Sequence, residues 1–356
     1  MIVGVLKENH LNEKRVSLTP YMITSLNKLG YEVLIEKDAG LSAGFANDEY
    51  LEKGAKAMLS AKELIAKADI IVGIHTTLNC IDHSNEIKAK HIIIGLLNPF
   101  FDKANVEKLI QAKATLFSLE LMPRISRAQS MDVLSSGSTV LGYKAVLLAA
   151  NLISKFFPMI MMSGTTIKPA KILVVGAGVT GLQAIATARR LGADVYGYDI
   201  REEAIEQIKS LGAAGLMPMP EKDADTLLLE HTKDADIIFC TANIIGKKSP
   251  IIISKEMVDG MMPGSLILDL VSEYGGNCEL CKKDETIITD NKVTIMSPSN
   301  LASDFPYHGS AVYSKNMSTY LQYLLEHYKE RKFDLEDDVI KSTMIAANGE
   351  SLKDFL

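Results

Sequence analysis

The sequence predicts an α/β fold of two doubly wound domains joined by long helices. Three observations support this fold class. Short apolar strands alternate with helical segments in both halves of the chain, a pattern typical of parallel sheets covered by helices on both faces. A glycine-rich motif follows one of the strands in the second half. The length of 356 residues suits two hydrophobic cores better than one.

The composition is that of a soluble globular protein, with 47% hydrophobic and 23% charged residues. The net charge of −6 and the scattered lysines argue against a nucleic-acid partner. No segment reads as a signal peptide, and no apolar run reaches the roughly 18 to 20 residues that a membrane-spanning helix needs. We therefore expect no direct membrane insertion, although the chain could serve as a soluble subunit of a membrane complex.

The first domain is expected to contain residues 1–136 together with the C-terminal segment 311–356. Its expected strands are rich in isoleucine and valine and cover residues 2–6, 32–35, 69–74, 91–97 and 114–118. Its expected helices cover residues 20–29, 48–53, 61–67 and 103–112. Thr19 and Pro20 are typical of an N-cap followed by proline at the first helical position, so we expect the first helix to begin there.

The second domain is expected to contain residues 137–310. A polar stretch at 123–138 precedes a mostly apolar helix at 139–157, whose one interior charge is Lys144. Strands are expected at 171–175, 194–198, 236–240, 266–270 and 292–296, and helices at 179–191 and 202–211. An amphipathic helix at 311–330 then leads back to the first domain.

Metal chemistry is not expected. Cys278 and Cys281 form a C-x-x-C pair, but a structural zinc site would need two more ligands at a similar spacing. The pair follows a turn, whereas a thioredoxin-like pair would open a helix. The four cysteines are therefore interpreted as ordinary thiols of a reducing compartment.

The glycine motif predicts a dinucleotide site. Gly176, Gly178 and Gly181 have G-x-G-x-x-G spacing between a strand and a helix, and Asp199 ends the next strand about 20 residues further on. Gly176 permits the turn, Gly178 leaves room for the pyrophosphate, and Gly181 lets the helix pack on the sheet. The expected contacts here are Gly176, Gly178, Val179, Gly181, Asp199, Ile200 and Arg201.

The predicted cofactor of this Rossmann-like fold is NAD(H). A carboxylate at Asp199 accepts hydrogen bonds from the adenosine ribose and repels the extra phosphate of NADP. Arg201 follows closely, so NADP is disfavoured without being barred.

The polar stretch is the most informative segment of the sequence. Residues 123–136 read PRISRAQSMDVLSS, in which several kinds of polar side chain lie between an α/β domain and a buried helix. On composition alone it could be a hydrophilic linker. It closely resembles the signature loop of the NAD(H)-binding first domain of proton-translocating nicotinamide nucleotide transhydrogenases, in their alpha subunit. The likeness covers most of the chain and includes Lys7-Glu8, the run 12–20, Gly142-Tyr143-Lys144-Ala145 and Gly275-Gly276-Asn277-Cys278-Glu279.

This resemblance implies direct hydride transfer from NADH on this chain to NADP⁺ on a partner domain, with the Re/Si specificity of that enzyme. It assigns Arg124, Gln129 and Asp132 to orienting the nicotinamide end, with Gln129 also reaching toward the partner's nucleotide. Asp132 and Ser135 would contact the carboxamide or its ribose, and Tyr143 would pack nearby. Further cofactor contacts are implied at Ile125, Ser126, Arg127, Thr241 and Ala242.

The resemblance also implies a homodimer. Partner subunits would carry the transmembrane and NADP(H)-binding domains, so that this chain is cytoplasmic and peripheral on the inner face of the cytoplasmic membrane.

An NAD-dependent alanine dehydrogenase is the main alternative, because that family shares the N-terminal and glycine motifs. Its enzymes need a cation for the substrate carboxylate and a histidine for proton transfer. Arg15 is retained here, but the positions of the family's lysine and histidine are held by His75 and Asn98. His75 keeps this alternative open, because an imidazole could act as a base.

A non-catalytic NAD-binding regulatory subunit is a third alternative. Two departures from the transhydrogenase pattern support it. Segment 212–236 is short and lacks the family's mobile loop, which predicts weaker or faster-exchanging NADH. The family's proline-rich stretch is replaced by residues 241–248, TANIIGKK. Retention of the whole loop at 124–136 argues against this alternative.

Overall fold

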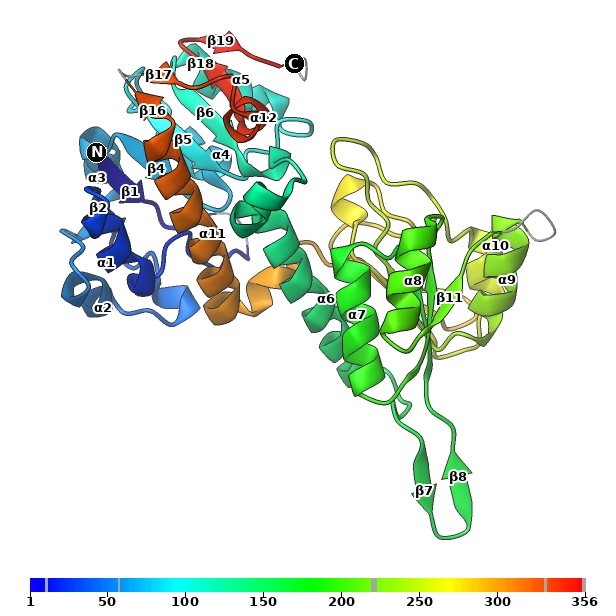
Figure 1. Cartoon of the computed structure of the whole chain (residues 1–356). Helices are drawn as coiled ribbons and strands as arrows, with labels where there is room; N and C mark the ends of the chain where they lie inside the picture. The colour runs from blue at the N-terminus through cyan, green and yellow to red at the C-terminus, as the bar shows by residue number, and fades with distance from the viewer. Residues whose placement is uncertain (10–11, 57, 219–222, 330–331, 354–356) are drawn as a thin grey trace. The chain divides into compact units, whose positions relative to one another are not determined.

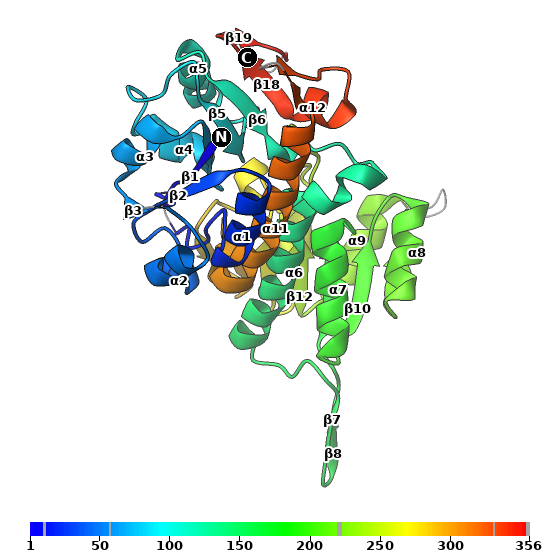
Figure 2. The same cartoon turned by 60° about the vertical axis from the view of Figure 1, so that its left-hand side comes forward.

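The computed structural model describes residues 1–9, 12–56, 58–218, 223–329 and 332–353. It divides the chain into two compact units (Figures 1 and 2). Unit 1 contains Met1–Gly137 and Ala302–Leu356, and unit 2 contains Ser138–Leu301. The chain therefore returns to unit 1 earlier than the expected 310–311. Each unit is built on a sheet of mainly parallel strands, which confirms the expected α/β class.

Unit 1 contains an eight-stranded sheet of order β19-β18-β6-β5-β4-β1-β2-β3. The strands are β1 (Ile2–Val5), β2 (Glu32–Glu36), β3 (Met58–Leu59), β4 (Ile70–Val72), β5 (Ile92–Gly95), β6 (Thr115–Ser118), β18 (Met344–Ala347) and β19 (Glu350–Ser351). β18 pairs antiparallel with β6, so the C-terminal segment completes a sheet begun at the N-terminus.

Successive strand residues in unit 1 enter two different cores. Ile70 and Val72 pack on one face of the sheet with α1 (Pro20–Lys28) and α11 (Pro306–Glu326). Ile71 packs on the other face, where α3 (Ala61–Lys67), α4 (Thr76–Ile81) and α5 (Lys103–Gln111) lie. This alternation explains the nearly continuous isoleucine and valine runs, because both faces of each strand are buried.

The remaining elements of unit 1 are short. They are α2 (Asn47–Glu52), α12 (Asp338–Thr343), the 3-10 turns η1 (Leu41–Ala43), η2 (Leu119–Leu121), η3 (Ser126–Met131) and η5 (Leu301–Asp304), and the strand pair β16 (Tyr328–Lys329) and β17 (Lys332–Phe333). Thr19 lies at the N-cap of α1 as expected, with Pro20 behind it. Its hydroxyl makes no capping bond and lies 3.2 Å from the hydroxyl of Ser314 instead.

Unit 2 contains a seven-stranded sheet of order β11-β10-β9-β12-β13-β15-β14. The strands are β9 (Lys171–Val175), β10 (Asp194–Tyr198), β11 (Ala214–Leu216), β12 (Ile237–Cys240), β13 (Leu266–Asp269), β14 (Thr286–Ile288) and β15 (Thr294–Met296). The helices are α6 (Val133–Leu152), which begins in unit 1, α7 (Val179–Arg190), α8 (Glu202–Ser210), α9 (Ala224–Asp234) and α10 (Lys255–Asp259), with the turn η4 (Ser272–Tyr274).

The two faces of this sheet are also both covered. Ile172 and Val174 of β9 pack in one core with residues of α6, α7 and α8. Leu173 and Val175 pack in the other core with residues of α9 and α10. All described pairings within this sheet are parallel except that of β14 with β15. Parallel strands end at one edge of the sheet, and that edge positions the site described below.

Three sequence-based expectations about the helices are corrected. The helix expected at 139–157 begins at Val133 and ends at Leu152, so the polar stretch is partly helical. The helix expected at 311–330 begins at Pro306 and ends at Glu326. Within the described residues, α6 is also long and apolar enough to cross a membrane, with a mean hydropathy of 1.3, against the expectation that no run qualifies. Its Ala145, Val146 and Ala149 are packed in the core of unit 2.

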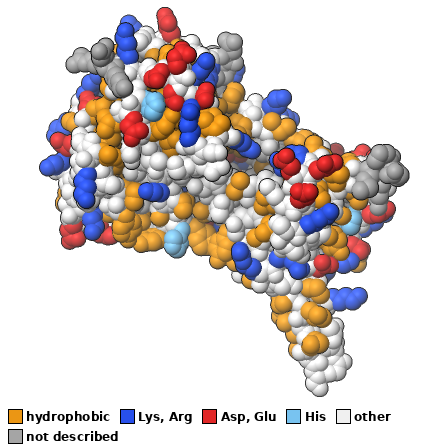
Figure 3. Space-filling model, viewed as in Figure 1, with side chains coloured by type: hydrophobic (Ala, Val, Ile, Leu, Met, Phe, Trp, Pro, Cys, Tyr) orange, Lys and Arg blue, Asp and Glu red, His pale blue; other side chains and the backbone are white. Residues whose placement is uncertain are grey.

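A two-stranded hairpin projects from unit 2 in both views (Figures 1 and 2). β7 (Ile160–Met162) and β8 (Thr165–Ile167) pair antiparallel around a two-residue turn in which Gly164 has a φ of 82°. Met161 is 78% exposed. Hydrophobic side chains lie along the hairpin in the space-filling view (Figure 3).

Candidate functional site

The three motif glycines of unit 2 are required for different reasons. Gly176 has a φ of 95°, which favours glycine. A Cβ on Gly181 would lie 1.9 Å from the carbonyl oxygen of Gly176, so only glycine lets α7 start this close to the end of β9. A Cβ on Gly178 would meet no protein atom within 4 Å. The fold thus fixes the first and third glycines and leaves open space at the second.

That open space lies at the start of α7, a helix of 12 residues whose N-cap is Gly178. Glycine has no side chain with which to cap the helix, and the first N–H groups of a helix have no partners inside it. They also carry the positive end of the helix dipole, which attracts phosphate groups. The residues present therefore fit a pyrophosphate here.

Asp199 follows β10 and lies beside the glycine loop. Its Oδ2 accepts a hydrogen bond of 2.8 Å from the backbone N–H of Ala177. The side chain of Arg201 binds both of its oxygens at 2.9 Å. Burial raises the pKa of Asp199, but the hydrogen bonds from Arg201 and Ala177 outweigh burial and lower it overall. Asp199 is thus held as a carboxylate at the position that a ribose-binding acid needs.

The loop after β12 borders Gly176 from the other side. The hydroxyl of Thr241 donates to the carbonyl oxygen of Gly176 at 2.6 Å. Ala242 is held at both backbone groups by the Asn277 side chain: its N–H donates to Oδ1 at 2.9 Å, and its carbonyl accepts from Nδ2 at 2.8 Å. The N–H of Asn277 in turn donates to Asp269. Asn277 therefore positions the loop, a role that its motif alone did not reveal.

Gly142 and Tyr143 lie on α6 in unit 2. A Cβ on Gly142 would lie 2.4 Å from the carbonyl oxygen of Thr180, in the first turn of α7. This glycine therefore lets α6 pack directly beside the start of the helix that bears the motif. Tyr143 is 42% exposed.

The polar loop at 123–136 lies in unit 1. Its residues 126–131 form η3, which rests on α11 through the buried side chains of Ala128 and Met131. Asn316 of α11 donates to the carbonyl oxygen of Ser130 at 2.8 Å. The exposed residues of the loop are Arg124, Ser126, Arg127 and Gln129, while Ile125, Asp132 and Ser135 are half-buried.

Two of the loop residues make interactions within unit 1 that the sequence did not suggest. Arg127 donates to Asp337 and to Asp338 at the start of α12, at 3.1 Å each. Asp132 accepts from the backbone N–H of Ser135 at 2.9 Å and from its hydroxyl at 2.6 Å. Asp132 has an extended backbone and directly precedes α6. It therefore caps that helix.

Replacement of Asp132 by alanine is expected to lower the free energy of unfolding by about 1 kcal/mol, because the cap on α6 is lost. Asn also caps helices, so Asp132→Asn should keep the stability of the parent while removing the charge. Urea denaturation of the three proteins measures this difference. Equal stability of Asp132→Ala and the parent would show that the bond to Ser135 does not hold the helix.

A buried charged cluster lies elsewhere in unit 1. The guanidinium of Arg15 binds both oxygens of Glu13, at 2.8 and 2.7 Å, and His75 lies 3.1 Å from the same carboxylate. Burial raises the pKa of Glu13, but its bonds to Arg15 and His75 outweigh burial and lower it well below its usual range. Glu8 accepts from the backbone of residues 74 and 75. His75 therefore faces this acid cluster.

The cysteines are free thiols. Burial is the largest cause that raises the pKa of Cys278 to about 11 and that of Cys281 to about 12. Thiols with such pKa values are poor nucleophiles at neutral pH. This agrees with their interpretation as ordinary thiols.

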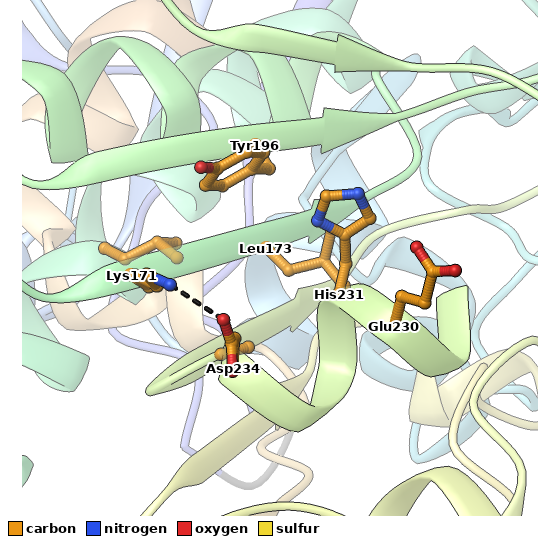
Figure 4. A pocket seen from close by; sticks show the side chains of 8 residues that line it. Lys171, Leu173, Tyr196, Glu230, His231 and Asp234 are labelled. Atoms are coloured by element: carbon orange, nitrogen blue, oxygen red, sulfur yellow. Dashed lines mark hydrogen bonds and ion pairs between the residues drawn. The ribbon is translucent and has the colours of Figure 1, made fainter. Parts of the chain in front are cut away.

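A separate hollow of about 300 Å³ lies beside the first residues of β9, whereas the glycine loop follows the end of that strand (Figure 4). Side chains of Lys171, Tyr196, His231 and Asp234 line it, and Lys171 is paired with Asp234 at 2.8 Å. The hollow is therefore separate from the dinucleotide site.

The shortened segment 212–236 contains β11 and α9. Its residues 219–222 lie outside the described residues. Asp223 caps α9 by accepting from the N–H of Thr226 at 2.8 Å. The segment thus forms regular structure on both sides of that gap.

Comparison with known proteins identifies relatives over the whole chain. Residues 4–141 match the family model "Alanine dehydrogenase/PNT, N-terminal domain" and residues 145–354 match "Alanine dehydrogenase/PNT, C-terminal domain". The chain is 37% identical to an NAD(P) transhydrogenase subunit alpha of Rickettsia prowazekii (strain Madrid E), covering 98% of this chain and 95% of that protein.

Solved structures agree. The transhydrogenase from Sinorhizobium meliloti superposes with a TM-score of 0.89 at 35% identity and covers 100% of both chains. An L-alanine dehydrogenase superposes with a TM-score of 0.87 at 22% identity, covering 99% of this chain and 97% of that one, which shows a shared fold. The chain belongs to the alanine dehydrogenase/PNT family, and within it the curated relative above is a transhydrogenase alpha subunit.

Proposed function

We propose that this chain is the NAD(H)-binding subunit of a proton-translocating transhydrogenase. The observation that carries the proposal is the open space at Gly178, at the start of α7 and beside the carboxylate of Asp199. It has the features that the pyrophosphate and the adenosine ribose require. The likeness to a transhydrogenase alpha subunit over nearly its whole length supports the choice of reaction.

Bound NADH supplies the hydride in this proposal. The chain's own groups bind and orient it. The glycine loop holds the phosphates, and Thr241 and Ala242 form the wall opposite Asp199. Arg124, Gln129 and Asp132 orient the nicotinamide end, with contacts from Ile125, Ser126, Arg127, Ser135 and Tyr143.

The hydride acceptor is NADP⁺ on a partner domain, reached with Re/Si specificity. Partner subunits carry that domain and the transmembrane domain. They hold the chain at the inner, cytoplasmic face of the membrane.

The geometry in unit 1 disfavours alanine oxidation. An amino-acid substrate needs a cation for its carboxylate, and Arg15 is the retained candidate. Its guanidinium is bound by both carboxylate oxygens of buried Glu13, and Arg15 itself is only 7% exposed. A substrate carboxylate would have to displace Glu13 and would face Glu8 as well. His75 shares the carboxylate of Glu13, which argues against its acting as the base.

The function is tested by mixing the purified chain with NADH and with the NADP⁺-loaded third domain of a transhydrogenase. We expect rapid hydride transfer, and no reduction of NAD⁺ when L-alanine is supplied. Transfer of hydride without alanine turnover supports the proposal. NADH binding without either activity would favour a regulatory subunit, and alanine turnover would favour the dehydrogenase.

We also propose that the chain is a homodimer and that the β7–β8 hairpin contributes to its interface. A two-stranded hairpin is marginally stable in water on its own. This one exposes large apolar side chains at positions flanking and within β7, namely Phe156, Met159, Met161 and Met162. Contiguous exposed apolar surface of this kind is typical of an interface.

Met161→Lys is expected to weaken the dimer at least about ten-fold, because it would place an unpaired charge in the interface. Light scattering during size-exclusion chromatography measures the mass over a range of concentrations. Met262→Lys is the matched control, since Met262 is 58% exposed in the same unit but lies away from the hairpin in the sequence. A Met161→Lys protein that remains dimeric at the lowest concentration would remove the hairpin from the interface.

A further inference from the structure

The carboxylate of Asp199 uses both of its oxygens twice within the protein. Oδ1 accepts from the backbone N–H of Arg201 at 3.0 Å and from its Nε at 2.9 Å. Oδ2 accepts from the backbone N–H of Ala177 at 2.8 Å and from Nη2 of Arg201 at 2.9 Å. A carboxylate offers about four acceptor positions, so these four bonds use all of them.

A ribose that binds Asp199 with its hydroxyls must therefore displace some of these donors. The two backbone donors are fixed by the turn after β10 and by the glycine loop. The two side-chain donors belong to Arg201, whose side chain is 58% exposed, whereas that of Asp199 is 8% exposed. Arg201 can swing into solvent, and Asp199 cannot move without breaking its bond to Ala177.

We propose that Arg201 sets the cofactor preference of this site by occupying the ribose-binding face of Asp199. The inference rests on the proposed function, because it concerns the same dinucleotide site. In the free protein, the guanidinium competes with the ribose hydroxyls and so weakens NADH binding. When it swings away, it becomes a cation beside the 2′ position of the ribose, where it pairs with the extra phosphate of NADP(H).

The charge balance at the site supports both effects. Paired with Arg201, Asp199 presents no net charge, whereas an unpaired carboxylate repels a 2′-phosphate. A third bond from Nη2 of Arg201 to the carbonyl oxygen of Ala177, at 3.3 Å, ties the guanidinium to the glycine loop as well. The arginine thus links the ribose and pyrophosphate ends of the site before either is filled.

The test compares the dissociation constants of NADH and NADPH for the full chain and three variants, measured by titration of the coenzyme fluorescence at low salt. Arg201→Ala should tighten NADH binding roughly three- to ten-fold and weaken NADPH binding by a similar factor. Arg201→Lys keeps the charge without the two-pronged geometry, so it should tighten NADH binding while keeping NADPH binding within about two-fold of the parent.

Arg190→Ala is the matched control. It removes the same charge from the exposed last turn of α7, at the opposite end of that helix from the glycine loop. It should change neither constant by more than about two-fold. Urea denaturation of each variant checks that the fold is retained, because this readout does not depend on the coenzyme.

The outcomes separate the two proposals. A parent chain that binds neither coenzyme overturns the proposed function. A parent that binds NADH, with an Arg201→Ala variant that binds NADH more weakly, overturns the inference alone, because it would show that Arg201 assists the ribose instead of competing with it. Unchanged NADPH binding in Arg201→Ala would likewise show that the guanidinium does not meet the 2′-phosphate.

Discussion

Substitution of Gly178 by valine is expected to weaken NADH binding by at least about 100-fold, which corresponds to about 2.8 kcal/mol. The free energy of unfolding should change by less than about 0.5 kcal/mol. The two effects separate because a Cβ at Gly178 would meet no protein atom within 4 Å. Its backbone, with a φ of −77° and a ψ of −170°, is extended and suits valine. The added methyl groups would instead occupy the space that the pyrophosphate needs.

Two variants make this prediction specific. Gly181→Ala should lower stability by about 1–3 kcal/mol, because its Cβ would overlap the carbonyl oxygen of Gly176. Gly137→Ala, also at a position with no atom within 4 Å, should alter neither stability nor binding. Coenzyme titration and urea denaturation are measured on each protein. A Gly178→Val variant that binds NADH normally would show that the phosphates do not lie at the start of α7.

The features of the fold that the sequence predicted are those with local signals. The parallel strands of unit 1 are runs of isoleucine and valine because both of their faces are buried, and such runs are visible without a structure. The glycine motif was readable for a similar reason, since a strand, a turn and a helix follow one another directly along the chain.

The features that were missed depend on contacts between distant residues or on polar residues inside a helix. β18 pairs with β6 across more than half of the chain, and nothing in its own residues names that partner. The start of α6 was placed too late because its first turn contains polar residues. The bond from Ser135 to Asp132 shows that these residues begin a helix.

The same distinction applies to the candidate site. Asp199 was predicted from its spacing, but its complete occupation by Arg201 and Ala177 could be found only from coordinates. The role of Asn277 depends on a contact with Ala242, 35 residues away in the sequence. The hairpin was not predicted, although Ser163-Gly164, a turn dipeptide beside an apolar run, is a usable signal for it.

Replacement of Gln129 by asparagine is expected to slow hydride transfer to the partner's NADP⁺ by about 100-fold, while NADH affinity stays within about three-fold of the parent. Gln129 is exposed on η3, and its backbone carbonyl, which the substitution keeps, is the group that bonds to Asp132. Asparagine retains the amide but shortens the side chain by one methylene. In the proposed mechanism this withdraws the amide from the two nucleotides and leaves the fold unchanged.

A large loss in transfer with little loss in binding is the signature of a group that positions reactants, because misplacement by about 1 Å can cost a factor of 10² in rate. Single-turnover transfer to the NADP⁺-loaded third domain gives the rate, and titration gives the affinity. Ser130→Ala is the neighbouring control, since the carbonyl oxygen of Ser130, and not its hydroxyl, accepts the bond from Asn316. It should alter neither quantity. Equal losses of rate and affinity in Gln129→Asn would reduce Gln129 to a coenzyme contact, and no loss of either would remove the loop from the reaction altogether.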